Sequence, residues 1–454
     1  MVEAVSQTQR EGDGPMTANS SSVPSVPSAR TLWRDRDFLL FWGGETVSLI
    51  GTQVTTLALP LAAILALNAD SRQLGFLRTA EFLPFIFLTL LVGPWVDSHR
   101  RLPIMVLANV ARGTLIALVP LLYALGVLRM PLLYAIALLI GVGTVLFDLS
   151  YLSYLPRLVR RGQIVEGNSK IVASQSFAPV VGPGMGGFLV GLLSAPVTLL
   201  VDAASYAISV VTMLLIRRPE PQLERQERKE KLLPAISQGL RIVFGNPYLR
   251  AIAGEGFTFN FFYQFIEVLF VLYAVRQLGF SAQSIGLIIG TGSVGAVVGS
   301  AFASRLAARL RFGPALVRSM WVACLAPMLI PLAAGGKRFE ATVLILAFFL
   351  IGVGEGVANV LAVSLRQTVT PDRLLGRMNA SMRLALYGAA PLGALAAGFL
   401  GEAIGLRPAF VVAAVGFVVA MLFIVFSPIP ALEVPPPDAE EPAGEAPGMQ
   451  PASR

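Results

Sequence analysis

Long apolar stretches separated by short polar segments run along most of the chain. There are twelve of them, and they cover residues 38–67, 74–95, 103–127, 131–155, 169–193, 197–216, 250–275, 283–304, 314–334, 341–364, 378–402 and 407–427. An α-helix of about 20 residues crosses a hydrocarbon core about 30 Å thick. The period-two alternation of apolar and polar residues that marks a membrane β-barrel is absent from these stretches. The pattern therefore predicts an all-α integral membrane protein with twelve transmembrane helices.

A charged break at residues 217–250 divides these stretches into six plus six. It contains RRPEPQLERQERKEKLLP, for which we expect a solvated cytoplasmic linker with an amphipathic piece lying along the membrane. The two predicted six-helix halves are residues 35–216 and 251–428. Residues 1–34 and the acidic, Pro-rich residues 429–454 have the composition of disordered cytoplasmic tails.

Composition agrees with a membrane protein and removes several other classes. Hydrophobic residues make up 55% of the chain, charged residues 14%, and mean hydropathy is +0.70. A single cysteine, Cys324, excludes an internal disulfide or a CxxC metal site, and a single histidine, His99, excludes zincin spacing. No GxxxxGK[ST] phosphate loop occurs. We therefore expect neither an enzyme nor a bound metal or cofactor.

The positions of the basic residues predict the orientation in the cell membrane. If both termini are cytoplasmic, 24 of the 35 lysines and arginines lie in cytoplasmic segments and six in external loops. This excess is the positive-inside signal, so a multi-pass protein with both termini in the cytoplasm is expected. The net charge of +8 then serves topology and contact with anionic membrane lipid, and a nucleic-acid partner is not needed to explain it.

The two halves are related in sequence. A shift of 211 residues aligns Asn168 with Asn379, Gly182 with Gly393 and Gly187 with Gly398. Two six-helix halves related in this way are typical of secondary transporters built from parallel repeats. Such transporters carry cargo at a site near mid-membrane between the halves, by alternating access.

The loop after the second stretch has the form G-x-x-x-D-x-x-R-R, with Gly93, Asp97, Arg100 and Arg101 at its fixed positions. This form resembles the signature between helices two and three of the major facilitator superfamily. The resemblance implies that Asp97 faces the start of helix eleven near Met378 and stabilises the outward-open state, with the arginines in cytoplasmic water. The alternative is an ordinary helix end that carries positive-inside charge.

A second motif lies in the fifth stretch, with Gly182, Pro183, Gly186 and Gly187 in a GPxxGG pattern. It resembles the antiporter motif of exporting members of the superfamily; the alternative is a generic packing and kink site. The segments SYLPRLV (153–159), VEGNSK (165–170) and LLVDAASY (199–206) look like those of the enterobactin-exporter and macrolide-efflux branch. The second-half copy of the loop signature has Ala303 where the aspartate would fall.

Polar residues within the apolar stretches are the candidates for coupling and for substrate binding, because a charge at mid-membrane costs about 2.5–3.5 kcal/mol by insertion scales. Glu355 is the first candidate, since it lies near mid-depth beside glycines that would leave room for substrate or water. Its alternatives are a hydrogen bond to a neighbouring helix or a pair with Arg112. The other candidates are Arg112, Asp148 (a possible partner of Arg112), Glu45, Gln53, Asn260, Gln264 and Asn359.

The resemblance and the charges together predict a secondary active transporter, a proton-coupled exporter of hydrophobic or amphipathic small molecules. With His99 in a loop, a membrane-embedded carboxyl group must carry the proton. The alternatives are a siderophore exporter and a lysophospholipid flippase. The expected partners are a small-molecule substrate, protons and membrane lipid, and the expected assembly is a monomer.

Overall fold

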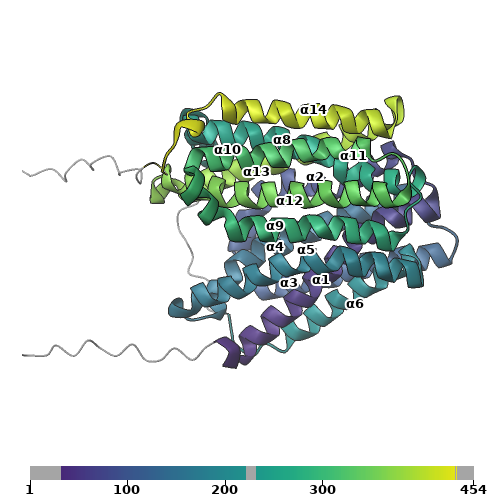
Figure 1. The fold of residues 1–454 in the computed structure, drawn as a ribbon. Coiled ribbons are helices and arrows are strands. Elements are labelled where there is room, and N and C mark those ends of the chain that lie inside the picture. Colours follow the sequence, from purple (N-terminus) through teal and green to yellow (C-terminus); the bar gives the residue numbers. More distant parts are fainter. Residues whose placement is uncertain (1–31, 221–231, 435, 437–454) are drawn as a thin grey trace, which may run out of the picture.

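The computed structural model describes residues 32–220, 232–434 and 436, and they are almost entirely helical (Figure 1). The first half contains α1 (Arg36–Leu67), α2 (Ser71–Asp97), α3 (Arg101–Ala124), α4 (Met130–Leu158), α5 (Ile164–Leu193) and α6 (Ala195–Leu214). The second half contains α8 (Pro247–Arg276), α9 (Ala282–Leu310), α10 (Phe312–Leu325), α11 (Leu329–Leu332), α12 (Lys337–Thr368), α13 (Leu375–Ile404) and α14 (Leu406–Val425). Short 3-10 turns are η1 (Leu32–Arg34), η2 (Arg161–Gln163), η3 (Ala326–Met328), η4 (Asp372–Leu374) and η5 (Ile429–Ala431).

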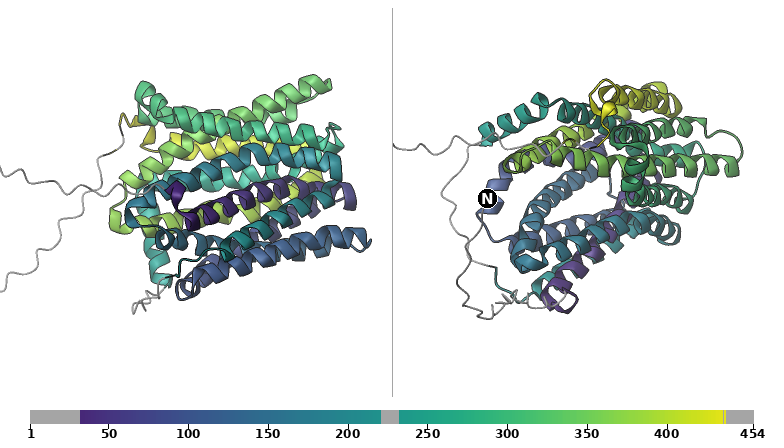
Figure 2. Two further views of the ribbon diagram at one scale, coloured as in Figure 1. Left: turned by 90° about the horizontal axis from the view of Figure 1, so that it is seen from below. Right: turned by 60° about the vertical axis from the view of Figure 1, so that its left-hand side comes forward.

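Within the described residues, eleven helical segments are long and apolar enough to cross a membrane, with α10, η3 and α11 counted as one. The remaining helix of similar length, α2, lies among them and packs against α4 and α13. Figures 1 and 2 show these helices running side by side through the molecule, with the two halves adjoining. The predicted all-α architecture of twelve membrane helices is confirmed. Of the predicted disordered tails at residues 1–34 and 429–454, residues 1–31 and 437–454 lie outside the described residues. The inner ends of both tails are ordered, because Leu32 and Ile429 are buried in the short turns η1 and η5.

Local sequence explains where several helices begin and end. Asp70 and Gln73 form a capping box at the start of α2, each side chain accepting the backbone N–H of the other. Asn246 accepts N–H groups at the start of α8, and Asn68 ends α1 in a left-handed conformation that asparagine tolerates. In the ninth span, Pro327 lacks an N–H donor, and there the helix is interrupted by η3.

The linker, for which a solvated segment with an amphipathic piece is predicted, contains a helix and contacts both halves. Residues 232–245 form the helix α7 (Leu232–Gly245), which packs against α8 and α13 of the second half. Residues 217–220 instead contact the first half: the N–H groups of Arg217 and Arg218 donate to Asp37, and Glu220 is buried beside the start of α3. The two ends of the linker are therefore attached to different halves.

We define the linker end of the bundle by the loops at residues 98–100, 215–246 and 369–374, and the far end by the loops at residues 68–70, 277–281 and 333–336. The described hydrogen bonds and ion pairs between the halves lie toward the far end: Arg72–Glu402, Arg78–Glu267, Thr79 to the Pro391 carbonyl, and Arg276 to the Asn68 and Ala69 carbonyls. Toward the linker end, Phe87 on α2 and Tyr387 on α13 are exposed. The halves are thus joined at the far end.

Candidate functional site

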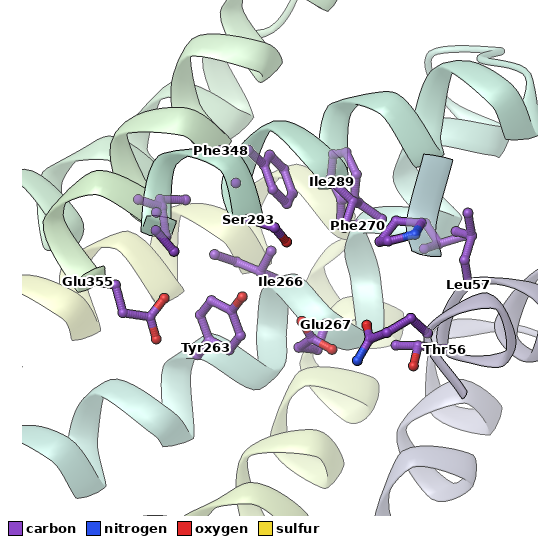
Figure 3. A pocket seen from close by; sticks show the side chains of 17 residues that line it. Thr56, Leu57, Tyr263, Ile266, Glu267, Phe270, Ile289, Ser293, Phe348 and Glu355 are labelled. Carbon is purple, nitrogen blue, oxygen red and sulfur yellow. The ribbon is translucent and has the colours of Figure 1, made fainter. Parts of the chain in front are cut away.

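A cavity of about 250 Å³ lies between the two halves (Figure 3). Its lining comes from α1 and α5 of the first half and from α8, α9 and α12 of the second. The lining is largely apolar and includes the aromatic rings of Tyr263, Phe270 and Phe348. Two carboxylates, Glu267 and Glu355, also line the cavity, and no lysine or arginine is among its lining residues. This position and composition suit a binding site for a small molecule with both apolar and polar parts.

Glu355 projects into this cavity from α12 (Figure 3). Its side chain is exposed there, and among the described residues it forms no ion pair with Arg112 or any other cation. Of its glycine neighbours, which are expected to leave room for substrate or water, Gly352 lines the cavity, and all three also pack against other helices. Gly352 and Gly356 lie directly against α9 at Gly292 and Ala296, and Gly354 lies against Ser319 and Ala323 of α10. The absence of side chains here lets α12 approach two helices closely, which holds Glu355 on a rigid element.

The four neutral polar candidates lie in different surroundings. Gln53 of α1 lines the cavity, whereas Asn260 donates its side-chain N–H to the Gly256 carbonyl on its own helix. Gln264 is buried outside the cavity lining, and its Oε1 atom has no hydrogen-bond partner. Asn359 is exposed one helical turn beyond Glu355. Gln53 is therefore the member of this group that lines the same cavity as Glu355.

Arg112 and Glu45 are buried inside the first half, Asp148 is half-buried there, and none of the three lines the cavity. The possible ion pair between Arg112 and Asp148 is not formed within 4.0 Å. The Arg112 guanidinium instead lies 4.4 Å from the centre of the Phe147 ring and 4.7 Å from that of Tyr206, and it donates to Asn109. Cation–π contacts satisfy this buried charge because the ring faces carry negative potential.

Glu45 and Asp202 complete this first-half cluster. Glu45 is 7% exposed, and its Oε2 atom has no hydrogen-bond partner. Asp202 is 1% exposed and accepts hydrogen bonds from Thr55 at 2.6 Å and Ser205 at 2.9 Å. The cluster therefore joins α1 and α6 through buried polar contacts, while Glu45 keeps an acceptor atom unused.

In the loop signature, Arg100 is exposed as expected but Arg101 is not in water. The Arg101 side chain is 4% exposed, and its Nη1 atom lies 3.9 Å from Glu220 of the linker. The Glu220 carboxylate also accepts the Arg101 backbone N–H at 2.9 Å and lies 3.4 Å from Arg157. An anion at a helix N-terminus is stabilised by the unpaired N–H groups and the helix dipole. Gly93 has no atom close to the position of a Cβ, and the side chain of Asp97 lies outside the described part of the structure.

The glycine motif of α5 contacts both halves. A Cβ on Gly182 would overlap the Gln53 side chain, and one on Gly186 would lie 3.3 Å from the Val54 backbone, so these two glycines pack against α1. A Cβ on Gly187 would overlap the Ala282 backbone of α9, across the boundary between the halves. Pro183 lines the cavity, and its carbonyl lies against Gly286 of α9. α5 stays continuous through Pro183.

Sequence reasoning missed the charged group that joins the halves at the edge of the cavity. Arg78 of α2 pairs with Glu267 of α8 at 2.8 Å and with Glu81 of its own helix, also at 2.8 Å. Neither Arg78 nor Glu267 is among the candidate residues that the sequence pattern singles out. The available signal was an arginine and a glutamate three residues apart within an apolar stretch, which places both on one helix face.

Comparison with known proteins gives consistent results. The family described as transmembrane secretion effector matches residues 28–446. The multidrug efflux pump Tap of Mycobacterium tuberculosis (strain ATCC 25618 / H37Rv) is 27% identical over 420 residues, which cover 87% of this chain and 95% of that protein. The enterobactin exporter EntS of Salmonella choleraesuis (strain SC-B67) is 27% identical over 226 residues, covering 49% of this chain and 52% of that protein.

Among solved structures, a bacterial homologue of the iron transporter ferroportin has the same fold. Its inward-facing state matches with a TM-score of 0.70 at 16% identity, over 86% of this chain and 98% of that chain. Its outward-facing state, with the same identity and the same coverage of both chains, has a TM-score of 0.54. The arrangement of the two halves described above is therefore more similar to the inward-facing arrangement of this fold.

Proposed function

Because the chain belongs to the transmembrane secretion effector family, within the major facilitator superfamily, we propose that it exports hydrophobic or amphipathic small molecules by alternating access. It is a multi-span membrane transporter with small-molecule substrates. The observation that carries the proposal is the cavity between the halves, which has an apolar and aromatic lining and two carboxylates. The similarity to Tap supports drugs or secondary metabolites as cargo, and the similarity to EntS supports siderophores as the second candidate.

The packing of the halves supports a cycle that starts with loading from the cytoplasm. The halves are tied together at the far end, which is the external side in the proposed orientation. Cargo would enter from the linker end, and rocking of the halves would then open the far end. We place both termini in the cytoplasm and treat a monomer in contact with membrane lipid as the working unit.

Glu355 is the proposed proton carrier. It lies in the cavity, where cargo and water arrive, and no described cation pairs with it. A carboxyl group in such a position can bind a proton when cargo leaves and lose it when cargo binds, which links export to proton entry. The Glu45 and Asp148 side chains lie outside the cavity lining and are the alternative carriers.

We assign the opening and closing of the two ends of the bundle to two sequence motifs, the loop signature and the glycine motif of α5. Asp97 is proposed to stabilise the closed linker end against the start of α13, because α2 ends and α13 begins at this end of the bundle, in different halves. The α5 glycines are proposed to form the close contact at the far end, because Gly187 and Gly286 place the backbones of α5 and α9 against each other.

Inverted membrane vesicles with an imposed pH gradient test this function directly. Uptake into the vesicles, which corresponds to export, should occur against a gradient for some members of a panel of cationic, neutral and anionic drugs, a catecholate siderophore and a lysophospholipid. Uptake should disappear when the pH gradient is dissipated. Uptake of the siderophore alone would select the second candidate, and movement of the lysophospholipid alone would select a flippase. No uptake of any compound by correctly inserted protein would contradict the proposal.

A further inference from the structure

Glu267 belongs both to the lining of the cavity and to an ion pair that joins the two halves. Its side chain lines the cavity between the halves (Figure 3), and its carboxylate pairs with Arg78 of the other half at 2.8 Å. The same group therefore faces the space for cargo and ties the far ends of the halves together. A molecule bound in the cavity can reach this tie without any change elsewhere in the protein.

Arg78 is held so that it can release Glu267 without losing every partner. Its second carboxylate, Glu81, lies 2.8 Å away on α2, and its guanidinium lies 4.7 Å from the centre of the Phe82 ring on the same helix. Removing one partner of a buried ion pair is strongly unfavourable when the other charge is left alone. Because Glu81 and Phe82 move with Arg78, separation of the halves leaves the arginine paired.

The charge of the cavity selects the kind of cargo that can replace Arg78. Glu267 and Glu355 line the same cavity and lie on either side of Tyr263 (Figure 3). No basic side chain is among the lining residues, whereas Tyr263, Phe270 and Phe348 offer ring faces. Carboxylates and aromatic faces both attract cations, and the repulsion between the two carboxylates is relieved by a positive charge between them.

We propose that the cargo is an amphipathic organic cation, and that its positive charge takes Glu267 from Arg78 and thereby unlocks the far end. This inference rests on the proposed export function and specifies its substrate class. A neutral or anionic molecule of the same shape has no charge with which to replace the arginine, so it leaves the tie intact. Arg78 is then a competitor of the cargo, and Glu267 is the group for which both compete.

Competition predicts opposite effects for the two partners of one ion pair. Glu267→Gln removes the carboxylate that attracts the cation, so cation affinity falls. Arg78→Gln removes the competitor and frees Glu267, so cation affinity rises. A pair that only holds the helices together would instead lose affinity in both variants.

A second ion pair supplies the matched control. Arg72 and Glu402 also join α2 to the second half, at 3.0 Å, but neither lines the cavity, and both side chains are more than 40% exposed. The variants Arg72→Gln and Glu402→Gln therefore break a contact between the halves without touching the charge of the cavity. Their cation affinity should equal that of the unmodified protein.

The binding test uses tetraphenylphosphonium and tetraphenylborate, which have nearly the same shape and opposite charge. Each is titrated separately by calorimetry into the full-length protein in lipid nanodiscs, with empty nanodiscs subtracted. We expect saturable binding of tetraphenylphosphonium only. Glu267→Gln should weaken it about tenfold or more, and Arg78→Gln should strengthen it severalfold.

The opening test measures the distance between spin labels at Val127 and Phe339, two exposed far-end positions in different halves, in a Cys324→Ser background. Tetraphenylphosphonium should lengthen this distance in the unmodified protein, and tetraphenylborate should leave it unchanged. In Arg78→Gln the longer distance should be populated without any cation.

Three results would overturn the proposal: equal binding of the two ions, weaker cation binding in Arg78→Gln, or unchanged cation binding in Glu267→Gln. Failure here can be separated from failure of the export function. If the vesicles accumulate neutral or anionic compounds but no cation, the protein is an exporter and the cation proposal is wrong. If nothing is accumulated, the export function itself is wrong.

Discussion

Carboxylates that look alike in the sequence have different environments in the structure. Glu355 is exposed to the cavity without a cation beside it, Glu267 shares Arg78 with Glu81, and Glu45 is buried with an unpartnered oxygen. A proton carrier must meet both water and cargo, and a group already paired with an arginine is poorly suited to exchange a proton. At the scale of the residue, Glu355 is therefore the group to test first.

Glu355→Gln preserves the size of the side chain and its ability to hydrogen-bond but removes the titrating group. We expect uphill efflux driven by a pH gradient to disappear, while exchange of labelled cargo down its own gradient continues. The control is Glu340→Gln on the same helix, where the amide oxygen can still accept the Gly335 N–H. Uphill efflux at the unmodified rate in Glu355→Gln would exclude Glu355 as carrier and direct the test to Asp148 or Glu45.

At the scale of the element, α5 has two packed faces that contact different halves. Gly182 and Gly186 hold it against α1 in its own half, whereas Gly187 holds it against α9 in the other half. The contact with α9 must form and break in each transport cycle if the halves rock. A side chain added on this face is therefore expected to shift the conformational equilibrium, because the close packing belongs to the far-end-closed arrangement.

Gly187→Ala places a Cβ where the Ala282 backbone lies, and overpacking of this kind costs about 1–3 kcal/mol. The far-end-closed state should become about 5–150-fold less populated relative to the open state. Cross-linking of cysteines at positions 72 and 402 with a short bifunctional reagent measures this change. In Gly184→Ala, whose Cβ would lie 4.0 Å from Leu287, cross-linking should be unchanged. Equal cross-linking in both variants would show that the α5–α9 contact does not control closure.

The linker also acts as an element, because Glu220 joins it to the start of α3. The Glu220 carboxylate is 5% exposed, accepts the Arg101 and Leu102 N–H groups and lies near two arginine side chains. An anion at a partly buried helix N-terminus contributes up to about 2 kcal/mol. The contact attaches the linker to the last residue of the loop signature, Arg101.

Glu220→Gln should accelerate hydrogen exchange of the Arg101 and Leu102 amides about 5–30-fold, as expected for a loss of 1–2 kcal/mol. Mass spectrometry of the peptide at residues 98–106 measures the change. The control is Glu433→Gln, which removes the exposed Glu433–Arg311 pair at the same end of the bundle. Exchange that stays slow in Glu220→Gln would show that the helix start is held without the linker.

At the scale of the whole molecule, the asymmetry of contacts and the asymmetry of charge coincide. The halves are tied at the far end, and the excess of lysine and arginine lies at the linker end. In the proposed orientation, in which the basic loops lie in the cytoplasm, the far end is external and is the closed side of the described arrangement. This is the state from which an exporter accepts cargo.

Single cysteines at Arg338 (far end) and Gln238 (linker end), in a Cys324→Ser background, test the orientation. In intact cells a membrane-impermeant maleimide should label the cysteine at position 338 and leave that at position 238 unlabelled. After permeabilisation both should react, because both positions are exposed. The reverse pattern of labelling would overturn the proposed topology and, with it, the direction of transport.

The sequence by itself determined the twelve-helix architecture and the presence of the polar segments that separate the helices. Both are local properties: the apolar length of each stretch is set by the thickness of the bilayer, and every backbone group in lipid must be satisfied within its own helix. It also singled out Glu355 and Gln53, which the structure places in one cavity. Depth along a helix can be counted in residues, and depth was the criterion for Glu355.

Only the tertiary structure decided which side chains meet. Arg78 and Glu267 are 189 residues apart, Arg101 pairs with a linker glutamate 119 residues away, and Arg112 lies between two aromatic rings rather than beside Asp148. The direction of a side chain around a membrane helix depends on how that helix is rotated against its neighbours. In lipid that rotation is set by close packing of small residues and by polar contacts between helices, so it follows from the assembled bundle and not from the apolar pattern of any one stretch.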